Sequence, residues 1–256
     1  MTIGYDPDMP PTGAEPQFPP LLTGVETRAG VDPFEKAVAD AHSGRAEIGH
    51  LYWSPDDAVL RAAIVFEPEV ALVDAAPILF AVANGLNDCI GALAPPEVGL
   101  QHVWPTGVKV NGALCGGWRV QAAGWAGDAV PGWMVVGLTL AVTSDADDPG
   151  RRPDVTALAE EGCGHLSRVR LLESWSRHTL VWVNRWEDDG FRPILEAWLG
   201  RADGRGGAVT VETADGPVSG TFLGLDEHGG MLLKTGDGPC TLPLSAALQH
   251  AQEWNA

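Results

Sequence analysis

The sequence predicts an α+β protein in which a mixed β-sheet packed with helices is followed by a small β-barrel. Residues 102–120, HVWPTGVKVNGALCGGWRV, alternate polar and apolar side chains on both sides of Asn111-Gly112, which is typical of a β-hairpin. Residues 169–190 repeat apolar side chains at steps of three and four, which is typical of an amphipathic helix. Beyond residue 206, short strand-like segments alternate with Asp-Gly and Gly-Gly turns, which indicates a small antiparallel barrel.

Length and composition set the size of the core. The chain has 256 residues, of which 45% are hydrophobic, and this suits one large domain or a large and a small one. The composition changes at the Asp-Gly-Arg-Gly-Gly run of residues 203–207. We therefore expect an extended, proline-rich arm over 1–20, a mixed α+β domain over 21–202 and a small barrel over 206–248.

Charge and cysteine usage exclude several classes of protein. The chain carries 34 acidic and 16 basic residues, a net charge of −18, so most of its surface would repel nucleic acid. The N-terminus lacks the basic and apolar regions of a secretory signal, and no uninterrupted apolar run is long enough for a membrane span. The four cysteines, at 89, 115, 163 and 240, are too far apart for a zinc motif or a disulfide framework. We expect reduced thiols, no metal and a cytoplasmic protein.

The N-terminal half contains one clearly capped helix and two strands. Asp32 and Pro33 are typical of the start of a helix, and Gly44 of its end. The apolar segments 48–53 and 59–67 are joined by Ser-Pro-Asp-Asp, which predicts a hairpin.

The remaining elements follow in order along the chain. Residues 71–93 are Ala-rich and apolar on more than one face, which indicates a mostly buried helix. Residues 133–142 predict another strand, and residues 155–161 a short helix that ends near Gly162. The long helix carries a stripe that we interpret as core, made of Leu172, Trp175, Thr179, Trp182 and Trp186. The barrel strands are expected at 208–213, 218–225, 230–234 and 239–244.

Several of these segments, in this order, resemble the biotin/lipoate protein ligase family, and biotin protein ligases most. Trp-Pro-Thr-Gly at 104–107 stands where the family has Trp-Pro-Asn-Asp, and Gly116-Gly117 holds the family's glycine position. Residues 133–142 resemble the family's next strand, 156–175 its helix pair after the active site, and 206–245 its SH3-like barrel. The resemblance implies a biotin/lipoate ligase-like domain followed by a small SH3-like β-barrel.

The resemblance also implies a reaction in two steps. ATP, with Mg²⁺, and a carboxylic acid such as biotin or lipoate form an acyl-adenylate, and a lysine of an acceptor protein then displaces AMP. This chemistry needs cationic groups for the leaving pyrophosphate, an apolar slot for the tail of the acid, and a loop that excludes water. The implied partners are therefore a small carboxylic acid and an acceptor protein.

The sequence departs from the family at the positions that bind phosphates or carry charged and polar side chains of the active site. The family has a Gly- and Arg-rich loop between its first two central strands, whereas YWSPDDAVLR at 52–61 is too short and too acidic to wrap phosphates, and only Arg61 remains nearby. Gly107 replaces the aspartate of the hairpin motif, Leu114 aligns with the family's lysine, and Ala141 with an asparagine. Standard ATP-dependent activity is therefore in question.

Lys109 is the one candidate for a relocated catalytic group. With a two-residue turn at Asn111-Gly112, Lys109 pairs with Leu114, and directly paired residues share a face of the sheet. Its ammonium could then reach a carboxylate or a phosphate. The alternative is a solvated strand residue, and both interpretations stay open.

Other side chains are candidates for ligand contact. Arg119 could meet a carboxylate if a bulge at Gly116-Gly117 resets the alternation, or it could pair with an acid of the protein. The two glycines allow close approach of a ligand or of a neighbouring strand. The candidate ligand-binding residues are Trp104, Pro105, Lys109, Gly116, Gly117, Arg119, His50 and Arg61, with core packing as the alternative for Trp104 and His50.

Cys163 suggests a different chemistry, because octanoyltransferases related to this family use a cysteine nucleophile in a Cys-Gly context; a turn between helices is the plainer interpretation. Three functions result: a divergent ligase-like protein that binds a biotin-, lipoate- or octanoate-type acid, an inactive homologue that acts as a binding or regulatory module, and a cysteine acyltransferase. A homodimer through sheet edges is possible.

Overall fold

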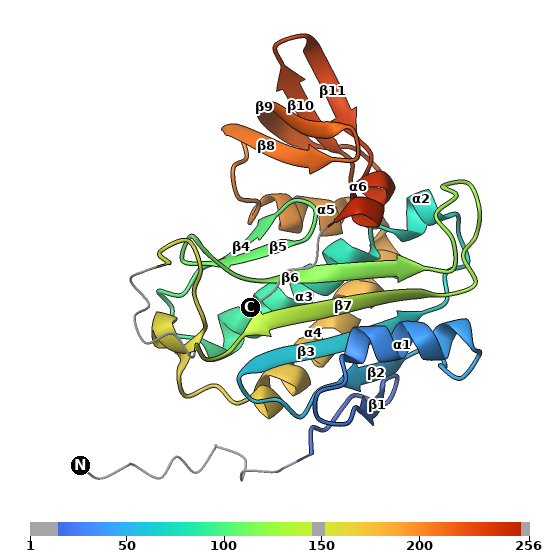
Figure 1. The fold of residues 1–256 in the computed structure, drawn as a ribbon, viewed down its shortest axis with the longest axis vertical. Helices are drawn as coiled ribbons and strands as arrows, with labels where there is room; N and C mark the ends of the chain where they lie inside the picture. The colour runs from blue at the N-terminus through green and yellow to red at the C-terminus, as the bar shows by residue number, and fades with distance from the viewer. Residues whose placement is uncertain (1–14, 145–151, 252–256) are drawn as a thin grey trace.

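The computed structural model describes residues 15–144 and 152–251, and its larger part is built on a seven-stranded mixed sheet (Figure 1). The strand order is β1-β2-β3-β7-β6-β5-β4, in which β1 and β2 are parallel and all other neighbours antiparallel. The strands are β1 (Thr23–Glu26), β2 (His50–Trp53), β3 (Val59–Phe66), β4 (Leu100–Val103), β5 (Gly107–Val110), β6 (Ala113–Ala122) and β7 (Met134–Ala141).

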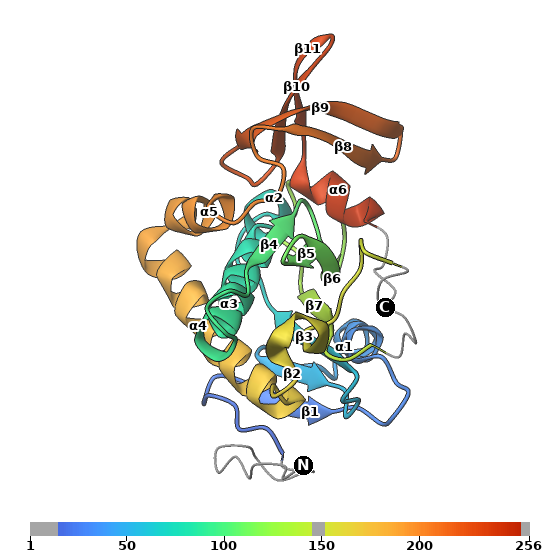
Figure 2. The same ribbon diagram turned by 90° about the vertical axis from the view of Figure 1, so that its left-hand side faces the viewer.

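Helices cover the two faces of this sheet unequally, as Figure 2 shows. The main core lies between the sheet and α3 (Ile78–Leu93), α4 (Arg168–Asp189) and α5 (Phe191–Leu199). On the other face α1 (Pro33–His42) packs over β2, β3 and β7 through a small cluster around Phe34 and Ala37. We call this second face the open face, because α1 covers only part of it.

The predicted hairpin is confirmed. Asn111 and Gly112 have φ of 50° and 90°, the positive values that a two-residue hairpin turn requires. Lys109 pairs with Leu114 as expected, and the register then shifts, because Val108 pairs with Gly116 and Cys115 has no partner on β5. This shift is a β-bulge, and it reverses the alternation of side chains along the rest of β6.

The helix predictions are confirmed for α1 and α4. The Asp32 carboxylate accepts hydrogen bonds from the backbone N–H groups of Phe34 and Glu35, as an N-cap does. In the stripe along α4, Leu172, Trp175 and Thr179 are buried, and the two tryptophans that follow are half-buried.

Two predicted helices differ in the structure. Residues 71–93 form two helices, α2 (Leu72–Ala75) and α3, because Pro77 has no backbone N–H with which to continue α2. The expected helix at 155–161 is a single wide turn over Ala159–Cys163, because Gly162 has a φ of 84° that ends any helical run. The segment Leu72–Leu93 is long and apolar enough to cross a membrane by composition alone, but 72% of its apolar window is buried in the protein core.

The C-terminal part is a four-stranded antiparallel sheet in the order β11-β10-β9-β8, followed by a short helix. It packs on the larger part through Trp104, whose Nε1 donates to the backbone oxygen of Gly229 at 2.9 Å, and beside Phe80, Phe191 and Trp198. The elements are β8 (Ala208–Thr213), β9 (Gly216–Leu225), β10 (Met231–Thr235), β11 (Gly238–Leu242) and α6 (Leu244–His250). The four strands match those expected from the sequence, and the predicted fold class is confirmed.

Gly229→Ala tests the packing of the C-terminal part against α3. It is expected to lower the free energy of unfolding by about 2–4 kcal/mol, because a Cβ would lie 2.3 Å from the Phe80 ring and φ is 78°. Gly224→Ala is the matched control, since its Cβ meets nothing within 4 Å. Urea denaturation of both variants measures the effect, and equal stabilities would contradict the packing described here.

Candidate functional site

The register of four strands places the candidate residues on the open face. Arg61 pairs with Thr139, Thr139 with Gly117, and Gly117 with Gly107, so these residues form one row across β3, β7, β6 and β5. Lys109 follows Gly107 by two residues on β5 and therefore points to the same face. Phe34 of α1 contacts the sheet at Gly137 on β7, two residues before Thr139 of this row.

Lys109 is held by an acid from the linker between the two parts. Its Nζ donates to Oδ2 of Asp203 at 2.6 Å, and both side chains are about 30% exposed. The linker is fixed beside β4, because His102 N donates to the Arg201 oxygen and Asp203 N to the His102 oxygen. The ammonium is therefore on the predicted face, and its charge is compensated by the protein.

Arg119 also reaches the open face, as the bulge allows. Its guanidinium donates to both carboxylate oxygens of Asp32 at 2.6 Å and to Glu35 at 3.3 Å, and it stacks on the Phe34 ring at 4.3 Å. Arg119 could have met a ligand carboxylate or an acid of the protein, and these contacts are those of an ion pair with acids of the protein. Arg119 joins the N-terminus of α1 to β6.

The connection between β2 and β3 is a tight acidic turn. Arg61 Nη1 contacts Asp56 Oδ2 at 3.2 Å, and Arg168 Nε contacts Asp57 Oδ1 at 3.1 Å. Asp56 also accepts a hydrogen bond from the backbone N–H of Ala58, and Arg168 stacks on Trp53 at 4.8 Å. Two arginines thus hold the two acids of this turn, one from each face of the sheet.

Several predicted residues do not join this row. His50 is on β2, which β3, β7 and β6 separate from β5, and its ring lies near Tyr52 and Glu47. Trp104 is 4% exposed and bonds the C-terminal sheet, and Pro105 follows it in the turn between β4 and β5.

The two glycines of β6 have different surroundings. Gly116 lies against β7, because a Cβ would be 2.3 Å from the Thr139 oxygen. Gly116 therefore allows the close approach of a neighbouring strand, which is one of the two roles considered for it. Gly117 belongs to the row on the open face.

Cys163 lies in the wide turn and is completely buried. Burial, together with the negative charges of Glu161 and Glu97, raises the pKa of its thiol. Burial also raises the pKa of Cys89 and of Cys115 to about 12. A cysteine nucleophile must be accessible and deprotonated, and the burial and the raised pKa of Cys163 disfavour both.

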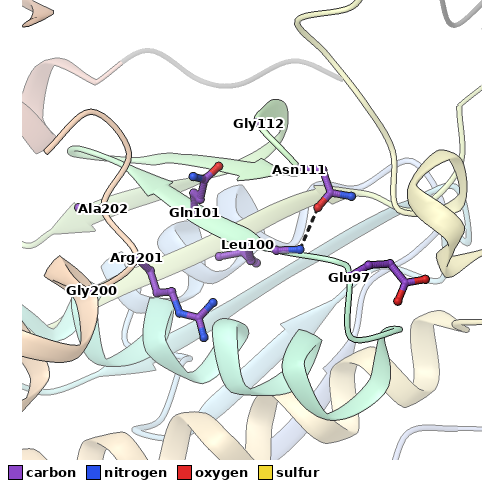
Figure 3. Close-up of a pocket in the computed structure, with 9 residues that line it drawn as sticks. Glu97, Leu100, Gln101, Asn111, Gly112, Gly200, Arg201 and Ala202 are labelled. Carbon is purple, nitrogen blue, oxygen red and sulfur yellow. Dashed lines mark hydrogen bonds between the residues drawn. The ribbon is translucent and has the colours of Figure 1, made fainter. Parts of the chain in front are cut away.

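A hollow of about 550 Å³ lies beside the hairpin turn (Figure 3). It is bordered by the turn, by β4 and by the linker at 200–202, and Figure 3 shows the hydrogen bond from Gly99 N to Asn111 Oδ1 that fixes one side. Lys109 is not among its lining residues. No group of three His, Cys, Asp or Glu side chains suited to a metal ion occurs in the described part of the chain.

Sequence reasoning missed Asp203, Asp57, Arg168 and His102. Asp203 pairs with a residue 94 positions away and Arg168 with one 111 positions away, so no local pattern signals either contact. His102 is 1% exposed, stacks on Trp198 at 5.6 Å, and neither ring nitrogen has a partner within the described residues. Burial, with a smaller effect of Arg201, lowers the pKa of His102 to about 3.

Comparison with known proteins agrees with this architecture. The model of the Biotin/lipoate A/B protein ligase family matches residues 18–200, and that of the Biotin protein ligase C terminal domain matches residues 206–250. The chain belongs to the biotin/lipoate A/B protein ligase family.

Named relatives include biotin ligases. The chain is 29% identical over 183 residues to the biotin–[acetyl-CoA-carboxylase] ligase of Paracoccus denitrificans, which is 70% of this chain and 75% of that protein. It is 24% identical over 208 residues to the bifunctional ligase/repressor BirA of Bacillus spizizenii, and this match spans 78% of the chain but only 62% of BirA.

Solved structures show the same fold. A biotin protein ligase-like protein of unknown function from Silicibacter sp. TM1040 is 42% identical, with a TM-score of 0.83 over 93% of this chain and 100% of that one. The biotin protein ligase of Aquifex aeolicus has a TM-score of 0.70 at 14% identity, covering 86% and 94% of the two chains. At that identity the likeness shows the fold alone.

Thiol reactivity tests the burial of the cysteines. In the native protein we expect Cys240 alone to react rapidly with a thiol reagent such as dithionitrobenzoate, because Cys89, Cys115 and Cys163 are buried. All four should react after unfolding in guanidinium. Cys240→Ser is the control and should remove the rapid phase. A rapid phase that persists in this variant would show that one of the buried thiols is accessible.

The buried His102 predicts a dependence of stability on pH. Its pKa of about 3 in the folded chain lies below the ordinary value of 6.5, so between these values the unfolded chain binds one more proton. The free energy of unfolding should therefore fall by up to about 1.4 kcal/mol per pH unit from this residue as the pH drops from 6.5 toward 3. His102→Phe keeps an aromatic ring beside Trp198 and should lose this contribution. Identical pH profiles, measured by urea denaturation, would contradict it.

Proposed function

We propose that this member of the ligase family binds a small carboxylic acid of the biotin, lipoate or octanoate type on the open face and does not activate it with ATP. Binding is supported by the family match and by Lys109, Arg61 and Thr139, which supply donors on one face. The biotin protein ligase of Aquifex aeolicus has been solved in complex with biotin and ATP. The closely similar Silicibacter protein has no assigned function.

The acidic turn between β2 and β3 is the feature that argues against activation of the acid with ATP. Stabilising the phosphates of ATP needs several cations that are free to face them. This turn instead presents two carboxylates, and the cations beside it are already paired, Arg61 with Asp56 and Arg168 with Asp57. Two ion pairs also hold the turn in place, which opposes closure over a ligand. The residues present do not fit ATP.

A second function is favoured by the similarity to the Paracoccus denitrificans ligase. In that case the chain would adenylate biotin and transfer it to a lysine of an acceptor protein. The free cysteines of the described chain support a cytoplasmic location for either function. Acyl transfer through Cys163 has no support from the geometry, since the thiol is buried.

Activity and binding separate these functions. With ATP, Mg²⁺ and biotin, lipoate or octanoate, we expect no acid-dependent release of pyrophosphate, whereas the Paracoccus denitrificans ligase with biotin serves as the positive control. Native mass spectrometry of the purified protein should show a co-purifying acid. Acid-dependent pyrophosphate release would establish ligase activity and overturn the proposal. Octanoyl-loaded carrier protein should leave the mass of the chain unchanged.

A matched pair of variants tests whether Lys109 binds the acid. Lys109→Met removes the ammonium and should weaken acid binding about tenfold, whereas Asp203→Asn frees the ammonium and should strengthen it. Lys234→Met, in the C-terminal sheet, is the control and should change nothing. Isothermal titration calorimetry measures each affinity. If both Lys109 and Asp203 variants bind as the wild type does, Lys109 is a solvated strand residue.

A further inference from the structure

A second hollow, of about 580 Å³, opens between the end of β3 and the C-terminal half of α4. Unlike the hollow beside the hairpin turn, it is lined mainly by apolar side chains, as binding grooves usually are. Its floor and wall are formed by Ile64, Phe66, Met134, Leu180, Val183 and Trp186. None of these residues belongs to the row on the open face.

The rim of this groove exposes large apolar side chains. Leu21 is 69% exposed, Ile48 66% and Val70 49%, and all three line the groove. They are three of the seven exposed large apolar side chains in the described part of the protein. Monomeric proteins rarely gather such side chains around a hollow, and where they do the surface usually binds a partner.

Every charged residue that lines the groove is an acid. These are Glu67, Glu69 and Glu187, all exposed, and none forms an ion pair within residues 15–144 and 152–251. An apolar groove bordered by unpaired carboxylates favours an occupant that is apolar at the centre and positively charged at the edges.

This charge argues against two other occupants. A second copy of the chain carries a net charge of −18 and would bring the same acids to the interface. Residues 1–14 contain two aspartates and no lysine or arginine, so this segment of the chain does not complement the groove either.

We infer that the groove is a docking site for a segment of another protein that presents apolar side chains flanked by lysine or arginine. The apolar side chains would cover Leu21, Ile48 and Val70, and the basic ones would face the three glutamates. This inference goes beyond the proposed function, because it uses no residue of the open face. The groove has room for a few side chains of leucine size, as a helix or an extended peptide presents them.

Two synthetic peptides test the inference on the full-length protein. One is an amphipathic helix of leucine and lysine, and its twin has glutamate in place of every lysine. We expect the lysine peptide to bind, in fluorescence anisotropy, with an affinity that falls as salt is added, and the glutamate peptide not to bind.

Variants locate the binding. The double substitution Leu21→Ser and Ile48→Ser should weaken the lysine peptide at least about tenfold, while Val130→Ser and Leu223→Ser, exposed apolar residues elsewhere, should have no effect. Glu67→Gln, Glu69→Gln and Glu187→Gln together should also weaken it about tenfold, whereas Glu212→Gln, Asp215→Asn and Glu227→Gln should not. All of the substituted residues are exposed, so circular dichroism should show folded proteins throughout.

Four results would overturn the inference. The first is binding of the glutamate peptide with the same affinity as the lysine peptide. The second is an equal loss of peptide affinity in the groove variants and the control variants. The third is a dimer in sedimentation velocity that Ile48→Ser dissociates, which would make a second copy the occupant. The fourth is tighter peptide binding after removal of residues 1–14, which would show that the chain covers its own groove.

Discussion

The arrangement of the open face depends on the register between β5 and β6. The turn at Asn111-Gly112 sets the pairing of Lys109 with Leu114, and the bulge at Cys115 then reverses the alternation along β6. Because of the bulge, Gly117 and Arg119 share a face with Lys109. Without it, the guanidinium of Arg119 would point into the apolar core beneath α4, where an unpaired charge is not tolerated. A single extra residue therefore determines which polar groups the face can offer.

The acidic composition explains why few of these polar groups are free. With 34 acids and 16 bases, most cations of the chain can find a carboxylate nearby. Lys109, Arg61, Arg119 and Arg168 each do so, and each of these four cationic side chains is less than about a third exposed. An anionic ligand must compete with these carboxylates for the cations, whereas a fold of the same shape with unpaired arginines would not impose this cost.

The sequence predicted the parts of the fold that depend on local chemistry. The N-cap at Asp32, the turn at Asn111-Gly112 and the apolar stripe of α4 each follow from residues close together in the chain, and all are confirmed. The break before α3 was missed, although Pro77 signals it, because the apolar composition of residues 71–93 continues across it. The segment that was expected to end near Gly162 does end there, but it forms a single turn and not a helix.

The site was harder to predict than the fold. Lys109 was placed on the correct face, since a hairpin register is local, but its partner Asp203 comes from a linker 94 residues away. The pairing of Asp57 with Arg168 likewise depends on how α4 packs under the sheet. His50 was a candidate for ligand contact, with core packing as the alternative. The strand order β2-β3-β7-β6-β5, which cannot be inferred from the chain order of the strands, separates it from Lys109.

The same hairpin joins the open face to the C-terminal sheet. Before β5 begins, Trp104 donates a hydrogen bond to Gly229, and along β5 Lys109 pairs with Asp203 of the linker. On β4, His102 exchanges backbone hydrogen bonds with Arg201 and Asp203, so the linker meets the edge of the sheet in a single parallel bridge. A movement of the C-terminal sheet would therefore pull on Lys109 directly. The Lys109–Asp203 ion pair and the two backbone hydrogen bonds to His102 together fix the start of the C-terminal part against the edge of the sheet.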